Sequence, residues 1–147
     1  MAGLVDRLRS DEGSAAIEAA VILPSLIMFL CLAIAGGRIV TSGAKIDSAA
    51  EDAAREASIH RTAAAAQGAA QSAAAESLND QGITCASTSV RVNTGGLSVP
   101  VGQVGTVTVT VTCTVNLSDL LLPGMPGAKT LTSTATSVVD QYRQRGE

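Results

Sequence analysis

Hydrophobic and polar positions follow three patterns along the chain, and each pattern predicts a different element. Residues 14–37 are almost wholly apolar, with Glu18 as the only charged residue, and Arg38 closes the run. At about 1.5 Å per residue, a helix of this length spans roughly 36 Å, which is enough to cross the hydrocarbon core of a bilayer. We therefore predict a transmembrane helix over residues 14–38, preceded by a short polar segment of residues 1–13.

Residues 41–79 are rich in alanine with interspersed charges, and alanine has the highest intrinsic helix propensity. One helical face carries apolar side chains, whereas the charged residues lie mostly elsewhere; that face contains Ile46, Ala50, Ala53 and Ala57. We predict an amphipathic helix over residues 41–79 that continues the transmembrane helix. Its apolar stripe is suited to packing on the chain's own sheet or on neighbouring copies. The alternative is a solvated spacer helix that is partly disordered around Gly68.

Beyond residue 83 the composition changes to valine and threonine. Over residues 107–117 the apolar side chains occupy odd positions and polar ones the even positions between them. This strict alternation is typical of an antiparallel strand that is buried on one face. Two further strands are predicted, at about residues 83–93 and 130–142. The resulting sheet needs a cover on its apolar face, and the Ala-rich helix is the candidate that the sequence offers.

The predicted fold class is therefore α+β. A long N-terminal helix crosses the membrane, continues as the Ala-rich helix, and packs on a small antiparallel sheet of about three strands. The sheet belongs to a strand-rich domain of residues 83–147 outside the membrane.

Composition excludes several classes of function. The chain has 147 residues, of which 46% are hydrophobic but only 1% aromatic, so we expect neither a large aromatic core nor a surface that stacks nucleobases. The net charge of −3, without a basic cluster, argues against nucleic-acid binding. One histidine and three cysteines without metal-ligand spacing argue against a metal site or a His-dependent triad. We expect no catalytic residue, no metal and no cofactor.

Cys85 and Cys113 are suited to form a disulfide, because folding the predicted hairpin at its midpoint places them opposite each other. The bridge would stabilise a small domain by roughly 2–4 kcal/mol. Val90 and Val92 have the opposite parity to Cys85, so we expect a bulge between residues 86 and 90. The alternative is two reduced, buried thiols. A disulfide implies an oxidising compartment, which places this domain outside and the N-terminus in the cytoplasm.

A second interpretation of the apolar run is a secretory signal, with Ala33-Ile34-Ala35 as its cleavage site. Against it, the N-terminal polar segment has more acidic than basic residues, and Glu18 would have no use. On this alternative the protein is a secreted binding module, or an uncut membrane-anchored one. The Val-Thr sheet would then be its ligand-binding surface.

The string Gly13-Ser14-Ala15-Ala16-Ile17-Glu18, followed by an apolar helix, resembles the processing region of type IV pilins and pseudopilins. Extended to Pro24, it looks most like the TadE-like proteins of tight-adherence (Tad/Flp) pilus systems. In that family a prepilin peptidase cuts after a glycine, and a glutamate is the fifth residue of the mature chain. The resemblance implies that Gly13 precedes the cut, that Ser14 is the new N-terminus, and that residues 1–13 are a cytoplasmic leader.

Glu18 has a physical interpretation of its own. A carboxylate at the edge of a membrane segment is costly unless it is paired. After cleavage, the new ammonium of a neighbouring subunit can pair with Glu18 and fix the axial register of an assembly. The alternative places Glu18 at the water interface without a special role. Pro24 lacks an amide N–H and is expected to kink or loosen the helix locally.

The resemblance implies a minor pseudopilin without catalytic activity, inserted as a single-pass protein in the cytoplasmic (inner) membrane. The cell surface or the pilus itself is a further location. The expected partners are other pilin and pseudopilin subunits, the prepilin peptidase, the pilus assembly platform and the lipid bilayer.

Overall fold

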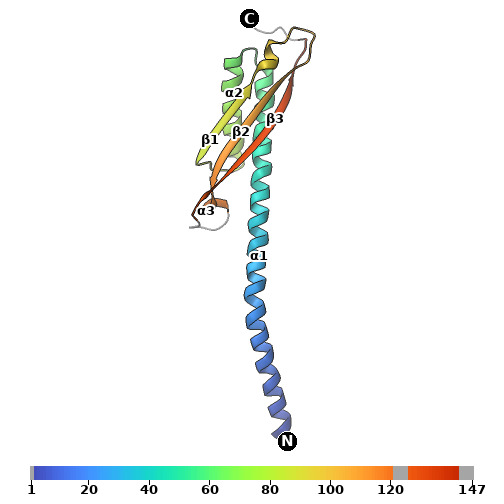
Figure 1. Ribbon diagram of the computed structural model, residues 1–147, viewed down its shortest axis with the longest axis vertical. Coiled ribbons are helices and arrows are strands. Elements are labelled where there is room, and N and C mark those ends of the chain that lie inside the picture. Colours follow the sequence, from blue (N-terminus) through green and yellow to red (C-terminus); the bar gives the residue numbers. More distant parts are fainter. Residues whose placement is uncertain (1, 121–125, 143–147) are drawn as a thin grey trace. The chain divides into compact units, whose positions relative to one another are not determined.

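The computed structural model describes the backbone of residues 2–120 and 126–142, and the side chains of residues 15–118 and 126–142. Its elements follow in the order α1 (Ala2–Ile59), α2 (Ala63–Asp80), β1 (Ser87–Asn93), the 3-10 helix η1 (Gly95–Ser98), β2 (Gly105–Asn116), α3 (Leu117–Leu120) and β3 (Ala128–Val139) (Figure 1). The α+β class predicted from the sequence is confirmed. The chain divides into two compact units, Met1–Gly37 and Arg38–Glu147, and α1 contributes to both.

In the unit Met1–Gly37, the apolar part of α1 presents its side chains outward. Every large hydrophobic side chain from Ile17 to Ile34 is exposed. The part of α1 from Ala15 onward is long and apolar enough to cross a membrane, and none of its most apolar stretch is buried by protein. A soluble protein rarely exposes so large a contiguous apolar surface, which agrees with a single-pass membrane helix.

In the unit Arg38–Glu147, the three strands form one antiparallel sheet in the order β1-β2-β3. The strand expected at about residues 83–93 begins only at Ser87, and the one expected at 130–142 is Ala128–Val139. Along β2 the side chains alternate between buried and more exposed positions, as the period-two pattern predicts. The buried ones are Val107, Val109, Val111, Cys113 and Val115.

The helix expected over residues 41–79 is two helices in the structure. The first is the end of α1, which stops at Ile59, and the second is α2, which begins at Ala63. Thr62 supplies the physical reason for the new start, because its side-chain oxygen accepts a hydrogen bond from the amide of Ala65 at 3.2 Å. High alanine content favours helix on both sides of this cap, so propensity alone does not locate the break.

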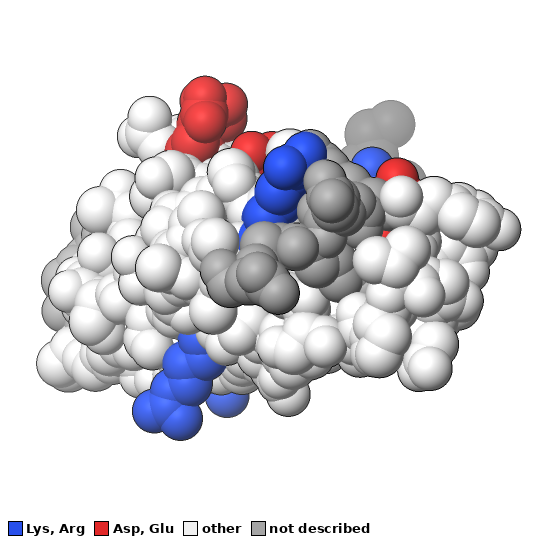
Figure 2. Space-filling view, turned by 90° about the horizontal axis from the view of Figure 1, so that it is seen from above, with Lys and Arg blue, Asp and Glu red and all other residues white. Residues whose placement is uncertain are grey.

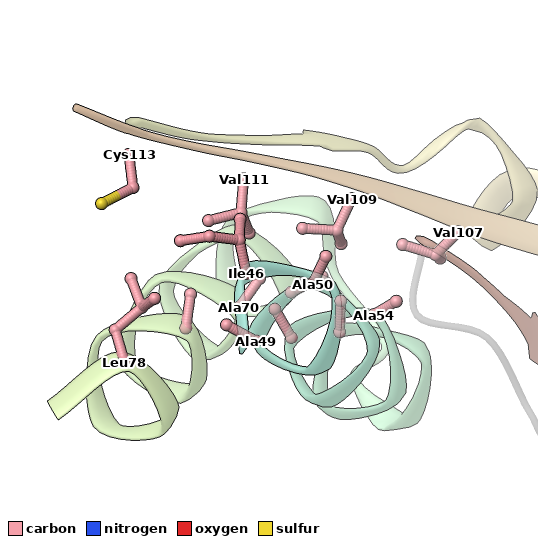
Figure 3. Packing of buried hydrophobic residues seen from close by; sticks show 14 of the residues in the cluster. Ile46, Ala49, Ala50, Ala54, Ala70, Leu78, Val107, Val109, Val111 and Cys113 are labelled. Carbon is pink, nitrogen blue, oxygen red and sulfur yellow. The ribbon is translucent and has the colours of Figure 1, made fainter. Parts of the chain in front are cut away.

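The two helices together cover the apolar face of the sheet (Figure 3). Ile46 and the alanines of α1 are buried beside the valines of β2, and α2 lies against β1. On α2 the buried residues recur every four positions, at Ala66, Ala70, Ala74 and Leu78. Alanine lets the helix backbones approach each other and the sheet closely, so a chain with one Phe and one Tyr still closes its core.

Hydrogen bonds join the two helices near the far end of α2. The ammonium of Lys45 donates to the backbone carbonyl of Gln81 at 2.7 Å, and the side-chain amide of Gln81 donates to the backbone carbonyl of Lys45 at 3.3 Å. Nearer the break, Ser77 donates to the Asp52 carboxylate at 2.8 Å. These contacts fix α2 against α1, and no pattern in the sequence indicates that these residues meet.

Candidate functional site

The resemblance places the candidate processing site at the head of the apolar helix. The backbone of Gly13 and Ser14 is helical and lies within α1, whereas their side chains are outside the described part of the structure. Glu18 lies one turn further on and is exposed, as are its neighbours Ile17 and Ala19. Within the side chains described, no cation lies at ion-pair distance from Glu18. Its carboxylate is therefore accessible to a group from another molecule.

Pro24 lies inside α1, and the helix continues through it to Ile59. Proline has no amide hydrogen, so the carbonyl of Ala20, four residues earlier, loses its usual helical donor. Next to it, the Ser25 hydroxyl donates to the carbonyl of Ile22 at 2.7 Å. The backbone is thus less tightly bonded here than elsewhere in the helix, and a kink at Pro24 remains a prediction.

Cys85 and Cys113 form a disulfide, with their Cα atoms 5.5 Å apart. The bulge expected between residues 86 and 90 is wrong, because β1 pairs with β2 residue by residue from Ser87 to Asn93. Cys85 lies two residues before Ser87, the first paired residue, so the alternation of β1 does not constrain it. The bridge closes a segment with a sequence separation of 28. For a loop of that size, the chain-entropy model gives roughly 3–4 kcal/mol of stabilisation.

The outer face of the sheet carries a ladder of threonine pairs, which we call the threonine ladder. Each threonine of β2 shares a hydrogen bond with the threonine opposite it on β3. The oxygen–oxygen distances are 3.1 Å for Thr108–Thr136, 3.0 Å for Thr110–Thr134, 3.3 Å for Thr112–Thr132 and 3.2 Å for Thr114–Thr130. Cross-strand threonine pairs stabilise a sheet and fix its register. Over these four pairs the face is therefore regular, polar and uncharged.

The described residues offer no assembled catalytic or metal centre. No group of three or more potential metal ligands occurs among them. His60 lies between α1 and α2, with its Nε2 3.5 Å from the Glu56 carboxylate, as the spacing of four residues indicates. Cys31 is exposed on the apolar helix. Figure 2, which views the structure from above, shows a mostly uncharged surface with a few separate charged groups.

The comparisons with known proteins address the N-terminal helix. No curated protein and no solved structure matches the chain. A family model matches residues 13–55, which begin at the glycine of the candidate processing site and end within α1. That family is a structural component of pili and not a known family of enzymes. The model is the one described as TadE-like protein, so residues 13–55 of this chain are similar to TadE-like proteins, and this similarity indicates a membrane protein associated with a Tad pilus.

Proposed function

We propose that this protein is a minor pseudopilin of a Tad-type pilus, processed by a prepilin peptidase and assembled through its N-terminal helix. One observation carries the proposal. Gly13 and Glu18 stand at the family's spacing, at the head of a membrane-length helix, and the TadE-like match begins at residue 13. The N-terminal helix mediates assembly, and the domain beyond residue 38 is the part of the protein that lies outside the membrane.

Cleavage after Gly13 removes the leader of residues 1–13 on the cytoplasmic side of the membrane. Ser14 then becomes the N-terminal residue, and its α-amino group is a new ammonium four residues before Glu18. The disulfide in the outer domain supports this orientation, because such bonds persist in oxidising compartments and are rare in the cytosol. The outer domain then lies outside the cytoplasm. Its partners there are other pilin and pseudopilin subunits.

Glu18 acts in this proposal by charge pairing between subunits. Its carboxylate is exposed on the helix and has no cation beside it among the side chains described. In the membrane or in a filament core, the ammonium at Ser14 of a neighbouring subunit offsets the cost of that charge. The pair fixes how far one helix is displaced along the next, and contributes register more than stability.

Pro24 suits a helix that must serve two environments. The helix is exposed to lipid before assembly and packs on other helices afterwards. The missing hydrogen bond to the Ala20 carbonyl lowers the cost of bending at this position. We propose that Pro24 lets the helix adjust its curvature when the subunit leaves the bilayer.

The mature N-terminus tests the proposal directly. Intact mass and N-terminal sequencing of membrane and sheared-surface fractions should give a chain that begins at Ser14. A chain that begins at Gly36 would mean an ordinary secreted module, and an uncut chain would mean a membrane-anchored one. Gly13→Val should block cleavage, because a branched side chain at the cut site hinders entry into a peptidase cleft. Gly3→Val is the matched control in the same leader and should be processed normally.

A further inference from the structure

The β3 edge of the sheet is open along its length. β3 pairs with β2 from Ala128 to Val139 on one side, and it is the last strand of the sheet on the other. In the described part of the chain, no backbone group of residues 129–139 has a hydrogen bond outside that pairing. An edge of this kind presents a row of amide and carbonyl groups that a further strand can bond.

The two edges of the sheet differ in their protection. β3 has one charged residue, Lys129 near its start, whereas residues 130–139 carry no charge and no proline, and the register with β2 runs unbroken. Over residues 130–139 the edge therefore lacks the usual devices that block an edge. β1 is shorter, at 7 residues, and carries Arg91. The carbonyl of Val90 is also occupied, since it accepts a hydrogen bond from the Gln67 side chain at 3.1 Å. Of the two edges, the one along β3 is therefore the more accessible to a further strand.

A groove runs beside this edge, between β3 and α1. Residues 133–138 of β3 form one wall, and Asp47, Glu51, Ala54 and Arg55 of α1 form the other. Asp47 and Glu51 are exposed, and neither has an ion-pair partner among the side chains described. The groove therefore offers room for the side chains of an added strand. Its two carboxylates outnumber its one guanidinium, that of Arg55, and the resulting net charge of −1 favours basic residues.

We propose that the β3 edge receives an extended segment of a different polypeptide chain, which adds to the sheet as a fourth, antiparallel strand. Its side chains toward α1 include lysine or arginine, which meet Asp47 and Glu51. Its side chains on the outer face are threonine, serine or valine, which extend the threonine ladder as Thr110 and Thr134 do within the chain. Backbone hydrogen bonds supply the affinity, and the alternating side chains supply the specificity.

A second copy of this chain is the less favourable occupant. In the outer unit α1 and β3 run in the same direction, and Ser58 near the end of α1 bonds Ser137 near the end of β3 at 3.1 Å (Figure 1). Two copies paired antiparallel through β3 would therefore place their α1 segments of residues 38–59 antiparallel. Copies that are inserted in one membrane with the same orientation have α1 segments that run in the same direction, which excludes this antiparallel pairing. We therefore assign the added strand to a different chain. This inference does not depend on peptidase processing.

A synthetic strand peptide tests the proposal. The probe is fluorescein-labelled Thr-Val-Thr-Lys-Thr-Lys-Thr-Val-Thr, which copies residues 106–114 of β2 with V109K, V111K and C113V. It is titrated by fluorescence anisotropy against the full chain in detergent micelles. We expect saturable binding, with slower hydrogen exchange at outward amides of residues 129–139 and no change in β1. A peptide with both lysines replaced by glutamate, and one with alternate amides N-methylated, should each bind at least tenfold more weakly.

Three variants locate the binding. Ser133→Lys places a cation in the groove and should abolish binding, whereas Thr112→Lys, on the outer face of the central strand, should leave it intact. The double variant Asp47→Asn, Glu51→Gln should weaken binding of the lysine peptide between about two- and thirtyfold, the range for two exposed ion pairs. Circular dichroism melts check that each variant is folded.

The proposal is overturned if the lysine and glutamate peptides bind equally, if Ser133→Lys binds as well as Thr112→Lys, or if no peptide binds. A free protein that is dimeric, with the β3 amides already protected, would assign the edge to a second copy and also overturn it. Failure here leaves pseudopilin processing untouched, because the mature N-terminus measures that separately.

Discussion

Cys113 lies opposite Thr88 in the β1–β2 ladder but is bonded to Cys85, three residues earlier in the chain. The bridge therefore connects the core of the sheet to the segment that leads from α2 into β1, where Ile83 and Cys85 pack against the core. The amide of Ala86 extends the ladder by bonding the carbonyl of Thr114 at 2.7 Å. The disulfide thus ties the connection from the helical layer to the sheet.

Removing this disulfide should lower the free energy of unfolding of the outer domain. We expect Cys85→Ser together with Cys113→Ser to cost about 2–4 kcal/mol, because the unfolded chain regains the entropy of the open loop. Urea unfolding followed by circular dichroism measures the change. Cys31→Ser is the control, since Cys31 is exposed on the apolar helix and should leave the midpoint unchanged. A midpoint that the double variant does not shift would contradict a structural role for the bridge.

Two glycines should respond in opposite directions to alanine. A Cβ at Gly96 would clash with the backbone of Thr106, whereas a Cβ at Gly68, in the middle of α2, meets nothing within 4 Å. Gly96→Ala should destabilise the domain by about 1–3 kcal/mol through overpacking. Gly68→Ala should stabilise it by about 0.5–1 kcal/mol, because alanine loses less backbone entropy in a helix. Thermal melts of both variants compare the signs, and equal shifts would count against the close approach at Gly96.

The alanines between the helices and the sheet should not tolerate larger side chains. Ala53 is fully buried on α1, whereas Ala75 is exposed on α2. Ala53→Leu should cost about 1–3 kcal/mol, because the larger side chain must displace the core residues packed around it. Ala75→Leu, the same change on the solvent side, should shift stability by less than about 0.5 kcal/mol. Denaturant unfolding of both variants measures the difference, and a neutral Ala53→Leu would mean that the interface is loosely packed.

Glu18 should be needed for assembly but not for insertion. Glu18→Ala should leave the amount of protein in the membrane fraction unchanged and reduce the amount in sheared pili, because the register-fixing charge is gone. Glu18→Gln keeps the size and removes the charge, so the same loss in both variants would assign the effect to charge. Immunoblots of the two fractions measure the outcome. Normal piliation in both variants would remove the proposed role of Glu18.

The N-terminal motif and the processing hypothesis come from the sequence, whereas the structure brings no second group to Glu18 among the residues described. A site formed by a neighbouring subunit is not visible in one chain, because its other half belongs to another molecule. The groove beside β3 shows the opposite case. Asp47 and Glu51 look like ordinary charges of an amphipathic helix in the sequence, and only the folded domain places them beside an open strand edge.

The sequence by itself determined the elements that depend on local pattern. The apolar run fixes a membrane-length helix, and the alternation around Val109 and Val111 fixes a half-buried strand, because both patterns report the environment of each residue in turn. Tertiary structure decided where continuous patterns stop. Alanine continues on both sides of Thr62, so the break arises from the cap and from a sheet face that needs two helices to cover it. Cys85 does not follow the alternation of β1, because it lies outside the paired part of the strand. The strand begins where backbone pairing with β2 begins, and that pairing depends on residues distant in the chain.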